Sequence, residues 1–299
     1  MNNESRRPRW LWPVLALPGT AWMVFFFAVP FYGVMAIAGG RDNILFNTRD
    51  PQWNPLRWNW DAYHTVWQGL GNGDFGRPFL NTFEYVIAAI VLCFIVGYPV
   101  AYYVARYGGK RRGLLLGLLL APFWISYLMR MLAWVNLLQD DGYVNDLLRH
   151  LHLISHPVGW LDGRPYTVIL GLVYGYVPFL ILPLYAALDR IDIRLLEASR
   201  DLGVSPLRTF TKVTLPLSRQ GMLAGAAITA LPMFGDYYTN TLLSGSPKTN
   251  MIGNQIQNAV QTNSTRGIGS ALVIVLTVLL TVLMFYYLYS SNQAAKELR

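Results

Sequence analysis

The stretch Asp192–Pro216 reads DIRLLEASRDLGVSPLRTFTKVTLP, and it decides how the rest of the chain is interpreted. It lies between two apolar runs, at about 166–188 and 221–243. Each run is long enough to cross a bilayer, which takes about 20 residues in a helix. A charged segment between two such runs is expected to project from the membrane.

Local signals within this stretch predict two short helices joined by a turn. Asp192 can cap the first helix, and Gly203 suits the left-handed residue that ends it. Ser205 followed by Pro206 is typical of an N-cap and the first position of a second helix. Pro216 is expected to end the unit before the next apolar run. Together these signals predict a compact helical knob, a shape that can dock into a groove on another protein.

The composition indicates that the chain is an integral membrane protein. Of its 299 residues, 54% are hydrophobic and 13% are charged, whereas about a quarter of a soluble domain is charged. The first apolar run is longer than the core of a signal peptide, which has about 7–15 residues, so we interpret it as a retained span. These features predict an all-α, polytopic bundle of six transmembrane helices. The six apolar runs lie at about 11–38, 80–105, 113–138, 166–188, 221–243 and 268–290.

The distribution of basic residues predicts the orientation of the bundle. With both termini in the cytoplasm, fifteen of the 24 Lys and Arg residues fall in cytoplasmic segments and eight fall in outer loops. This bias follows the positive-inside rule and puts the knob in the cytoplasm. The net charge of +8 therefore reflects topology, and we expect no nucleic-acid partner. The cytoplasmic set includes residues near both ends of the chain: Arg6, Arg7, Arg9, Lys296 and Arg299.

The knob also carries a family signature. The signature is Glu-Ala-Ala, then three residues, Gly, nine residues and Ile-x-Leu-Pro. The chain matches this spacing with Glu197-Ala198-Ser199, Gly203 and Val213-Thr214-Leu215-Pro216. In this pattern the chain resembles the permeases of type I ABC importers, with Ser in place of the second Ala and Val in place of Ile. The resemblance implies a type I ABC importer permease fold whose loop couples the membrane helices to a separate ATPase subunit. The resemblance implies that three residues shape the knob: Glu197, Ala198 and Gly203. The residues expected to contact the ATPase are Leu207, Arg208 and Phe210.

The resemblance also implies an organisation and a set of partners. Residues 80–290 would form a five-helix permease core that includes the coupling loop 189–220. Residues 1–79 would add an N-terminal tail, the first span and a long outer loop, and 291–299 would form a cytoplasmic tail. The expected partners are a second permease subunit, favoured to be a paralogue, an ABC ATPase dimer, an external solute-binding protein and membrane lipid. The implied location is the inner membrane of a bacterium.

The chain is not expected to be an enzyme or to hold a cofactor or a metal. Gly108-Gly109-Lys110 lacks the Walker A spacing, so ATP and Mg²⁺ would bind the ATPase subunit. No His-Glu-x-x-His or Gly-x-Ser-x-Gly motif occurs, so no catalytic residues are assigned. Three loop histidines, His150, His152 and His156, could approach one metal ion, but loop histidines without cysteines are usually solvated.

Three ionisable residues fall within the predicted spans: Glu84, Arg130 and Asp236. Charges in lipid are costly and usually face a cavity or each other, and the distances from the span ends put all three in the outer half of the bundle. Pro232 and Gly235 indicate an interrupted helix beside Asp236, a common device at transporter binding sites. Two interpretations stay open. The three side chains line a cavity and meet the solute, or Arg130 forms a structural pair with one carboxylate.

The sequence around Asp236 is similar to that of a narrower group. The sequence resembles that of spermidine/putrescine-type permeases in three places: 234–256, 126–134 and Asn81-Thr82. The resemblance implies a polyamine substrate, and two carboxylates with nearby aromatic rings suit a cation. The aromatic residues assigned to this path are Trp134, Tyr237 and Tyr238, although they could equally be interfacial anchors. The alternatives are another small solute, such as an amino acid, an organic ion or a sugar, and a secondary transporter.

Overall fold

The computed structural model describes residues 11–43 and 48–297, and this part of the chain is almost entirely helical. It divides into two compact units. The first comprises the residues up to Gly69 together with Ile256–Thr277, and the second comprises Leu70–Gln255 together with the residues from Val278 onward. The basic residues of the predicted cytoplasmic tails at Arg6, Arg7, Arg9 and Arg299 lie outside the described residues.

The first unit begins with an apolar helix that is long enough to cross a membrane, Trp12–Ala38. Two short antiparallel strands follow, β1 (Arg41–Asn43) and β2 (Thr48–Asp50), which the sequence did not predict within an otherwise helical chain. Strands of three residues carry too little alternation to be recognised in a sequence. The remaining elements that begin within this unit are α1 (Leu11–Met23), η1 (Val24–Ala28), α2 (Val29–Ala38), η2 (Pro55–Arg57), α3 (Asp61–Asn72), η7 (Asn263–Thr265) and α15 (Arg266–Glu297).

Arg49 on β2 fastens the hairpin to the end of α2. Its Nε lies 3.1 Å from the Ile37 carbonyl oxygen, and its Nη2 lies 3.0 Å from that of Ala38. Its Nη1 forms an ion pair with Asp42 at 2.9 Å. The last carbonyls of a helix lack partners within the helix, and a cation at this end is stabilising. A Cβ on Gly267 would lie 2.3 Å from Nε of Arg49, so glycine at 267 leaves the space that this side chain occupies.

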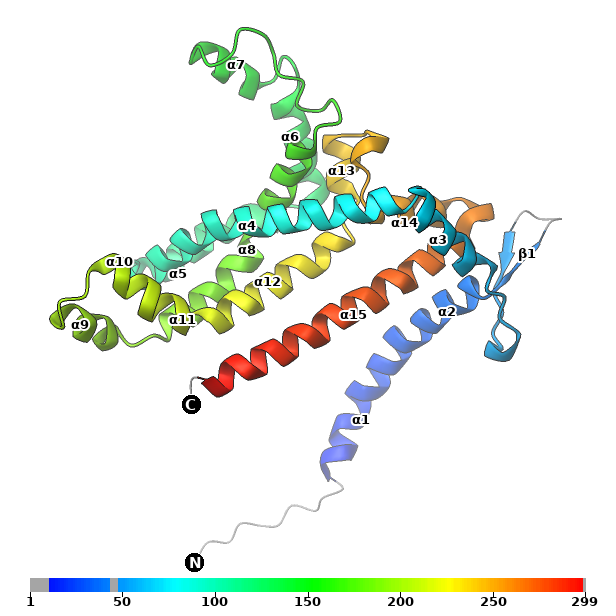
Figure 1. The fold of residues 1–299 in the computed structure, drawn as a ribbon, viewed down its shortest axis with the longest axis horizontal. Helices are drawn as coiled ribbons and strands as arrows, with labels where there is room; N and C mark the ends of the chain where they lie inside the picture. The colour runs from blue at the N-terminus through cyan, green and yellow to red at the C-terminus, as the bar shows by residue number, and fades with distance from the viewer. Residues whose placement is uncertain (1–10, 44–47, 298–299) are drawn as a thin grey trace, which may run out of the picture. The chain divides into compact units, whose positions relative to one another are not determined.

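The core of the second unit is formed by three long helices, α4 (Gly76–Tyr107), α8 (Pro165–Asp189) and α12 (Arg219–Phe234), which pack against one another (Figure 1). Small residues at their contacts let the backbones come close. A Cβ on Gly221 would lie 2.3 Å from that of Ala187, and one on Gly225 would lie 3.0 Å from Leu180 Cδ1. Such contacts are typical of membrane helices, which associate through close packing.

Shorter elements complete the second unit. Figure 1 shows α9 and α10 at one end of the three-helix core, whereas α6 and α7 extend away from it. The other elements that begin within this unit are η3 (Gly109–Arg111), α5 (Arg112–Leu120), η4 (Ala121–Trp124), α6 (Tyr127–Leu138), α7 (Tyr143–His150), α9 (Ile193–Asp201), α10 (Pro206–Thr209), η5 (Phe210–Thr214), α11 (Leu215–Leu217), α13 (Tyr238–Leu243), η6 (Pro247–Thr249) and α14 (Ile252–Gln261).

The described chain contains four helices that are long and apolar enough to cross a membrane, and a bent pair adds a fifth if it is one span. The bent pair, Gly109–Trp124 and Tyr127–His150, occupies the predicted run 113–138 and turns by 85°. Ile125 and Ser126 at the bend have extended backbones, which interrupt the helix. The predicted run 221–243 is divided between α12 and α13. Six spans and cytoplasmic termini therefore remain predictions.

Candidate functional site

The loop after α8 folds into the predicted knob. Asp192 Oδ1 accepts a hydrogen bond from the Arg194 amide at 3.0 Å, so it caps α9 as the sequence predicts. Gly203 has a φ of +79° and follows the end of α9. Its amide donates to Arg200 O at 2.8 Å, and the Val204 amide donates to Ser199 O at 3.1 Å. These two bonds form a Schellman motif, which confirms the predicted left-handed end of the helix.

The second helix of the knob begins and ends close to the predicted residues. It begins after Ser205, with Pro206 in its first turn, as expected. The chain then continues through the π-helical turn η5 to Leu217, and a turn at Ser218 separates it from α12, so the unit ends within one residue of the predicted position. Pro216 lies in the first turn of α11, where a missing amide is tolerated. The hydroxyls of Ser199 and Thr209 lie 3.0 Å apart and join α9 to α10.

The structure separates the predicted coupling residues into two groups. Glu197, Ala198, Gly203 and Arg208 are exposed, and Leu207 keeps 74% of its surface accessible. Phe210 instead packs on α4, with its ring centre 5.5 Å from that of Tyr98 and 5.9 Å from that of Tyr102. Phe210 therefore attaches the knob to the membrane helices.

One exposed residue of the knob did not appear among the predicted contacts. Leu202 is 83% accessible. It lies at the C-cap, directly after the last residue of α9.

Asp236 is the centre of a buried polar cluster. It lies between α12 and α13, so the interrupted helix predicted from Pro232 and Gly235 is confirmed. Asp236 is only 6% exposed. Its Oδ2 accepts hydrogen bonds from the hydroxyls of Tyr127, Tyr176 and Thr239, each at 2.8 Å. Its Oδ1 accepts one from the Thr239 amide at 2.9 Å.

Two glycines on α8 create the space for this cluster. A Cβ on Gly175 would lie 2.7 Å from Cε2 of Tyr127, and a Cβ on Gly171 would lie 2.6 Å from Cγ2 of Thr239. Tyr176 and Thr239 were missed by the sequence reasoning, because their contact with Asp236 depends on packing between helices. The glycines at a spacing of four residues were the available signal, since this spacing permits close approach of helices.

Arg130 lies next to the same cluster but forms no ion pair with any described residue. Its guanidinium carbon lies 4.3 Å from the ring centre of Phe123, 5.4 Å from that of Tyr127 and 5.8 Å from that of Tyr174. The side chain is 8% exposed, and its buried Nε and Nη1 have no hydrogen-bond partner among the described residues. Of the two interpretations of the three charges, the structural pair is therefore not seen here. The hydroxyl of Tyr127 reaches Asp236 while its ring faces Arg130.

The other residues assigned to the solute path lie in different settings. Glu84 is exposed on α4 and takes part in none of the described hydrogen bonds or ion pairs. Trp134 packs on Tyr174 at 5.3 Å between ring centres. Tyr237 and Tyr238 stack on each other at 4.2 Å, directly after Asp236. The structure thus groups Arg130 and Asp236 around Tyr127 and leaves Glu84 outside the described contacts.

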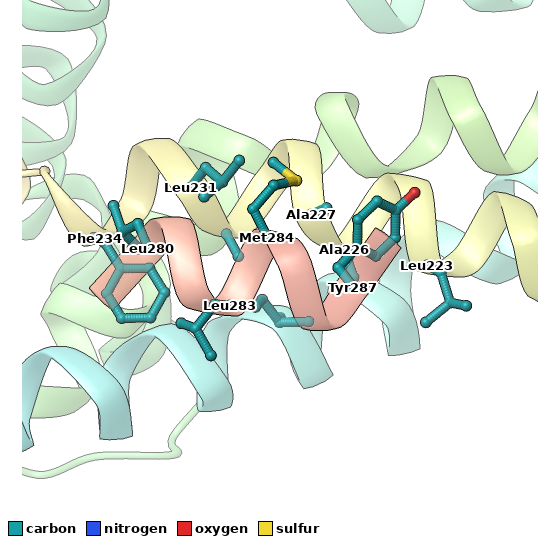
Figure 2. Close-up of a pocket in the computed structure, with 11 residues that line it drawn as sticks. Leu223, Ala226, Ala227, Leu231, Phe234, Leu280, Leu283, Met284 and Tyr287 are labelled. Atoms are coloured by element: carbon teal, nitrogen blue, oxygen red, sulfur yellow. The ribbon is translucent and has the colours of Figure 1, made fainter. Parts of the chain in front are cut away.

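A separate groove of about 200 Å³ runs along α4, α12 and the end of α15 (Figure 2). Its lining is apolar except for the hydroxyl of Tyr287, and Figure 2 shows Phe234 and Met284 among the side chains that face it. A groove whose polar lining is a single hydroxyl offers no charged group to pair with a charged solute. It therefore does not compete with the Asp236 cluster as a solute site.

The apolar helices and the exposed knob fit a multi-pass membrane protein, and similarity to known proteins identifies its class: a permease subunit of an ABC importer, located in the inner membrane. The family of binding-protein-dependent transport system inner membrane components matches residues 94–294, and the chain belongs to it. It is 34% identical to the spermidine/putrescine transport system permease protein PotB of Haemophilus influenzae, over 91% of each chain. It is 35% identical to PotB of Escherichia coli, over 73% of this chain and 78% of that protein.

Solved structures agree on the fold. One chain of a bacterial alginate ABC transporter, crystallised in complex with an alginate pentasaccharide-bound periplasmic protein, aligns with a TM-score of 0.70. The alignment covers 95% of this chain and 94% of that one, at 19% identity. A chain of the MetNI methionine ABC transporter aligns with a TM-score of 0.53 over 73% of this chain and 94% of that one, at 20% identity.

Gly203→Val is expected to destabilise the knob by about 1–2 kcal/mol, because a β-branched residue resists the left-handed backbone. No atom lies within 4 Å of a Cβ at this position, so the whole cost comes from the backbone. The measurement is the free energy of unfolding of the purified subunit in detergent. Gly203→Asn is the control, since Asn tolerates this backbone and should lose much less. Equal losses for Val and Asn would contradict the assignment of the turn.

Proposed function

We propose that this chain is the polyamine-conducting permease subunit of its importer and that Asp236 binds an ammonium group of the solute. The observation that carries the proposal is the buried Asp236 carboxylate, whose hydrogen-bond donors are all neutral. The attraction between a carboxylate and an ammonium group is strong in a medium of low polarity, and ionisable residues within spans usually face a cavity or each other. The names of the PotB relatives, which refer to spermidine and putrescine, support the same solute class.

The aromatic groups around Asp236 suit the same ligand. A polyamine alternates ammonium groups with short apolar stems, and the rings of Tyr127 and Tyr176 lie 5.8 Å apart beside the carboxylate. Aromatic faces attract cations, and each tyrosine hydroxyl can accept a hydrogen bond from an ammonium group. The stacked pair Tyr237 and Tyr238 adds a partly accessible aromatic surface next to Asp236. We propose Trp134 as support for this wall rather than as a direct contact, because it packs on Tyr174.

The proposed assembly has two permease chains, with this chain paired to a paralogue, an ATPase dimer that binds ATP and Mg²⁺, and an external solute-binding protein. In this assembly the chain has six spans, both termini face the cytoplasm, and the knob projects on the same side. The ATPase contacts are the exposed residues Glu197, Ala198, Leu202, Leu207 and Arg208. Phe210 transmits the movement to α4 through Tyr98 and Tyr102.

A second candidate is an importer for an anionic organic solute. The observation that favours it is the buried guanidinium of Arg130, which lacks an anionic partner among the described residues. This candidate uses the same assembly and the same knob, so the choice of solute distinguishes the two.

The solute class is tested with the complete importer in proteoliposomes, together with its binding protein. ATPase activity is measured with putrescine, spermidine, an amino acid, an organic anion and a sugar. The proposal predicts stimulation by the polyamines alone. Stimulation by an organic anion would favour the second candidate, and stimulation by any other solute would refute the polyamine assignment while leaving the importer family intact.

Asp236→Asn is expected to raise the polyamine concentration needed for half-maximal transport by roughly 10- to 100-fold. The change removes the charge and keeps the shape, and a hydrogen bond to a charged group contributes about 1.5–3 kcal/mol. The measurement is uptake of labelled spermidine into proteoliposomes. Asp141→Asn is the matched control, because Asp141 is an exposed carboxylate in the loop between α6 and α7 and should change this concentration by less than about threefold. Equal effects of the two substitutions would contradict the role of Asp236.

Leu207→Asp is expected to reduce solute-stimulated ATPase activity at least about tenfold, because it places an unpaired charge in the proposed contact with the ATPase. Leu207 is largely exposed in the subunit, so insertion and folding should be unchanged. Leu207→Met is the control, since it keeps an apolar side chain of similar volume. Normal stimulation with the Asp variant would remove Leu207 from the docking surface.

A further inference from the structure

The first unit contains a groove of about 530 Å³ between α2, α14 and the start of α15. Its polar lining consists of Arg266, Gln257 and Ser270, and the other side chains that line it are apolar. None of the described residues of this lining carries a carboxylate. A groove with one cation and no anion attracts an anionic group and repels a polyamine, so it fits a ligand other than the proposed solute.

The walls of this groove are fixed by a buried side chain of the same unit. Arg49 is 9% exposed and donates to the carbonyls of Ile37 and Ala38 at the end of α2. It also passes so close to Gly267, the second residue of α15, that a Cβ there would lie 2.3 Å from its Nε. The end of α2 and the start of α15 are therefore held on either side of Arg49, and the groove between them is preformed.

The polar groups of the lining are available to a ligand. Gln257 and Ser270 form no side-chain hydrogen bond with any described residue. Arg266 is exposed, donates from Nη2 to Asn263 Oδ1 at 2.9 Å, and forms no ion pair with a described residue. A guanidinium has five N–H donors, so most of those of Arg266 are left for an anion.

The order of the lining groups along α15 follows the polarity of one leaflet of a bilayer. Arg266, Ser270 and Val273 recur at steps of four and three residues and so share one face of the helix. Arg266 and Ile37 each lie within three residues of the end of a helix that is long and apolar enough to cross a membrane. Val273 lies about 10 Å further along α15, at a rise of 1.5 Å per residue. The cation is therefore at the level of lipid headgroups and Val273 at the level of acyl chains.

We propose that this groove binds a phospholipid, with the phosphate at Arg266 and an acyl chain between Val34 and Val273. Phosphate oxygens accept paired hydrogen bonds from a guanidinium. The hydroxyl of Ser270, one turn deeper, is placed to donate to an ester carbonyl of the glycerol. Inorganic phosphate would leave the apolar part of the groove uncovered, whereas a phospholipid covers both parts in the orientation that it has in the bilayer. The inference does not depend on the solute or on the other subunits.

The test identifies what lies in the groove by photo-crosslinking. A photo-crosslinking amino acid replaces Val34 in the full chain, and the importer is placed in vesicles of phosphatidylethanolamine and phosphatidylglycerol. Illumination should give a phospholipid adduct, identified by mass spectrometry. Val278, which is 59% exposed on α15 and outside the groove lining, is replaced in the same way to report the lipid that merely surrounds the protein.

Dependence on Arg266 separates a bound lipid from the surrounding lipid. Arg266→Gln is expected to lower the phospholipid adduct at position 34 at least about tenfold, because it removes the charge-assisted hydrogen bonds, and to leave the adduct at position 278 unchanged. Arg57→Gln is the control, since Arg57 is an exposed arginine of the same unit outside the groove lining and should change neither. A protein adduct at position 34, or a phospholipid adduct there that is unchanged by Arg266→Gln, would overturn the inference.

A second measurement leaves Arg266 intact and therefore does not depend on the folding of its variants. Native mass spectrometry of the importer in detergent compares dioleoyl phosphatidylglycerol with dioleoylglycerol, which has the same chains without the phosphate. One site per chain should fill at an at least about tenfold lower concentration of the phospholipid. Val34→Trp, which fills the apolar part of the groove without changing its charge, should remove this site. Equal affinities for the two lipids, or an unchanged site in Val34→Trp, would refute the proposal.

Discussion

Charges inside a membrane protein must be stabilised by protein groups, since water is scarce there, and the second unit is organised around this constraint. The carboxylate of Asp236 is stabilised by hydrogen bonds from three hydroxyls and one amide. These donors come from α6, α8 and the start of α13. The carboxylate can be reached by all of them only because α12 ends at Phe234 and because Gly171 and Gly175 let the neighbouring side chains approach α8. The break in the helix, the glycines and the tyrosines therefore form one structural solution.

The same unit connects this cluster to the knob by direct contacts. Phe210 packs on two tyrosines of α4, and the hydroxyl of Tyr98 lies 2.8 Å from that of Ser218, which precedes α12. Arg106 near the end of α4 donates to the Ile191 carbonyl at 2.9 Å, just before α9. The knob is thus held to α4 from both of its ends. The contacts of the knob therefore run to α4 and to the start of α12, and α12 ends at Phe234, two residues before Asp236.

Local signals in the sequence predicted local structure well. The cap at Asp192, the left-handed turn at Gly203 and the break near Asp236 each depend on a few neighbouring residues, and each is present. Contacts between distant segments were not predictable in this way. The bend at Ile125 looks like a continuous apolar run in sequence, and the aromatic surroundings of Arg130 join residues from η4, α6 and α8. The family motif identified the knob, but only packing shows that Phe210 turns inward.

The central claim is that a cationic solute binds at the Asp236 carboxylate, and the most direct test is the structure of the assembled importer with spermidine trapped inside. Electron cryo-microscopy of the complex would locate the solute relative to Asp236 and Arg130. The account predicts density for an ammonium group within hydrogen-bond distance, about 2.7–3.2 Å, of Asp236, between the rings of Tyr127 and Tyr176. Solute density away from Asp236, with its four hydrogen bonds unchanged, would contradict the claim.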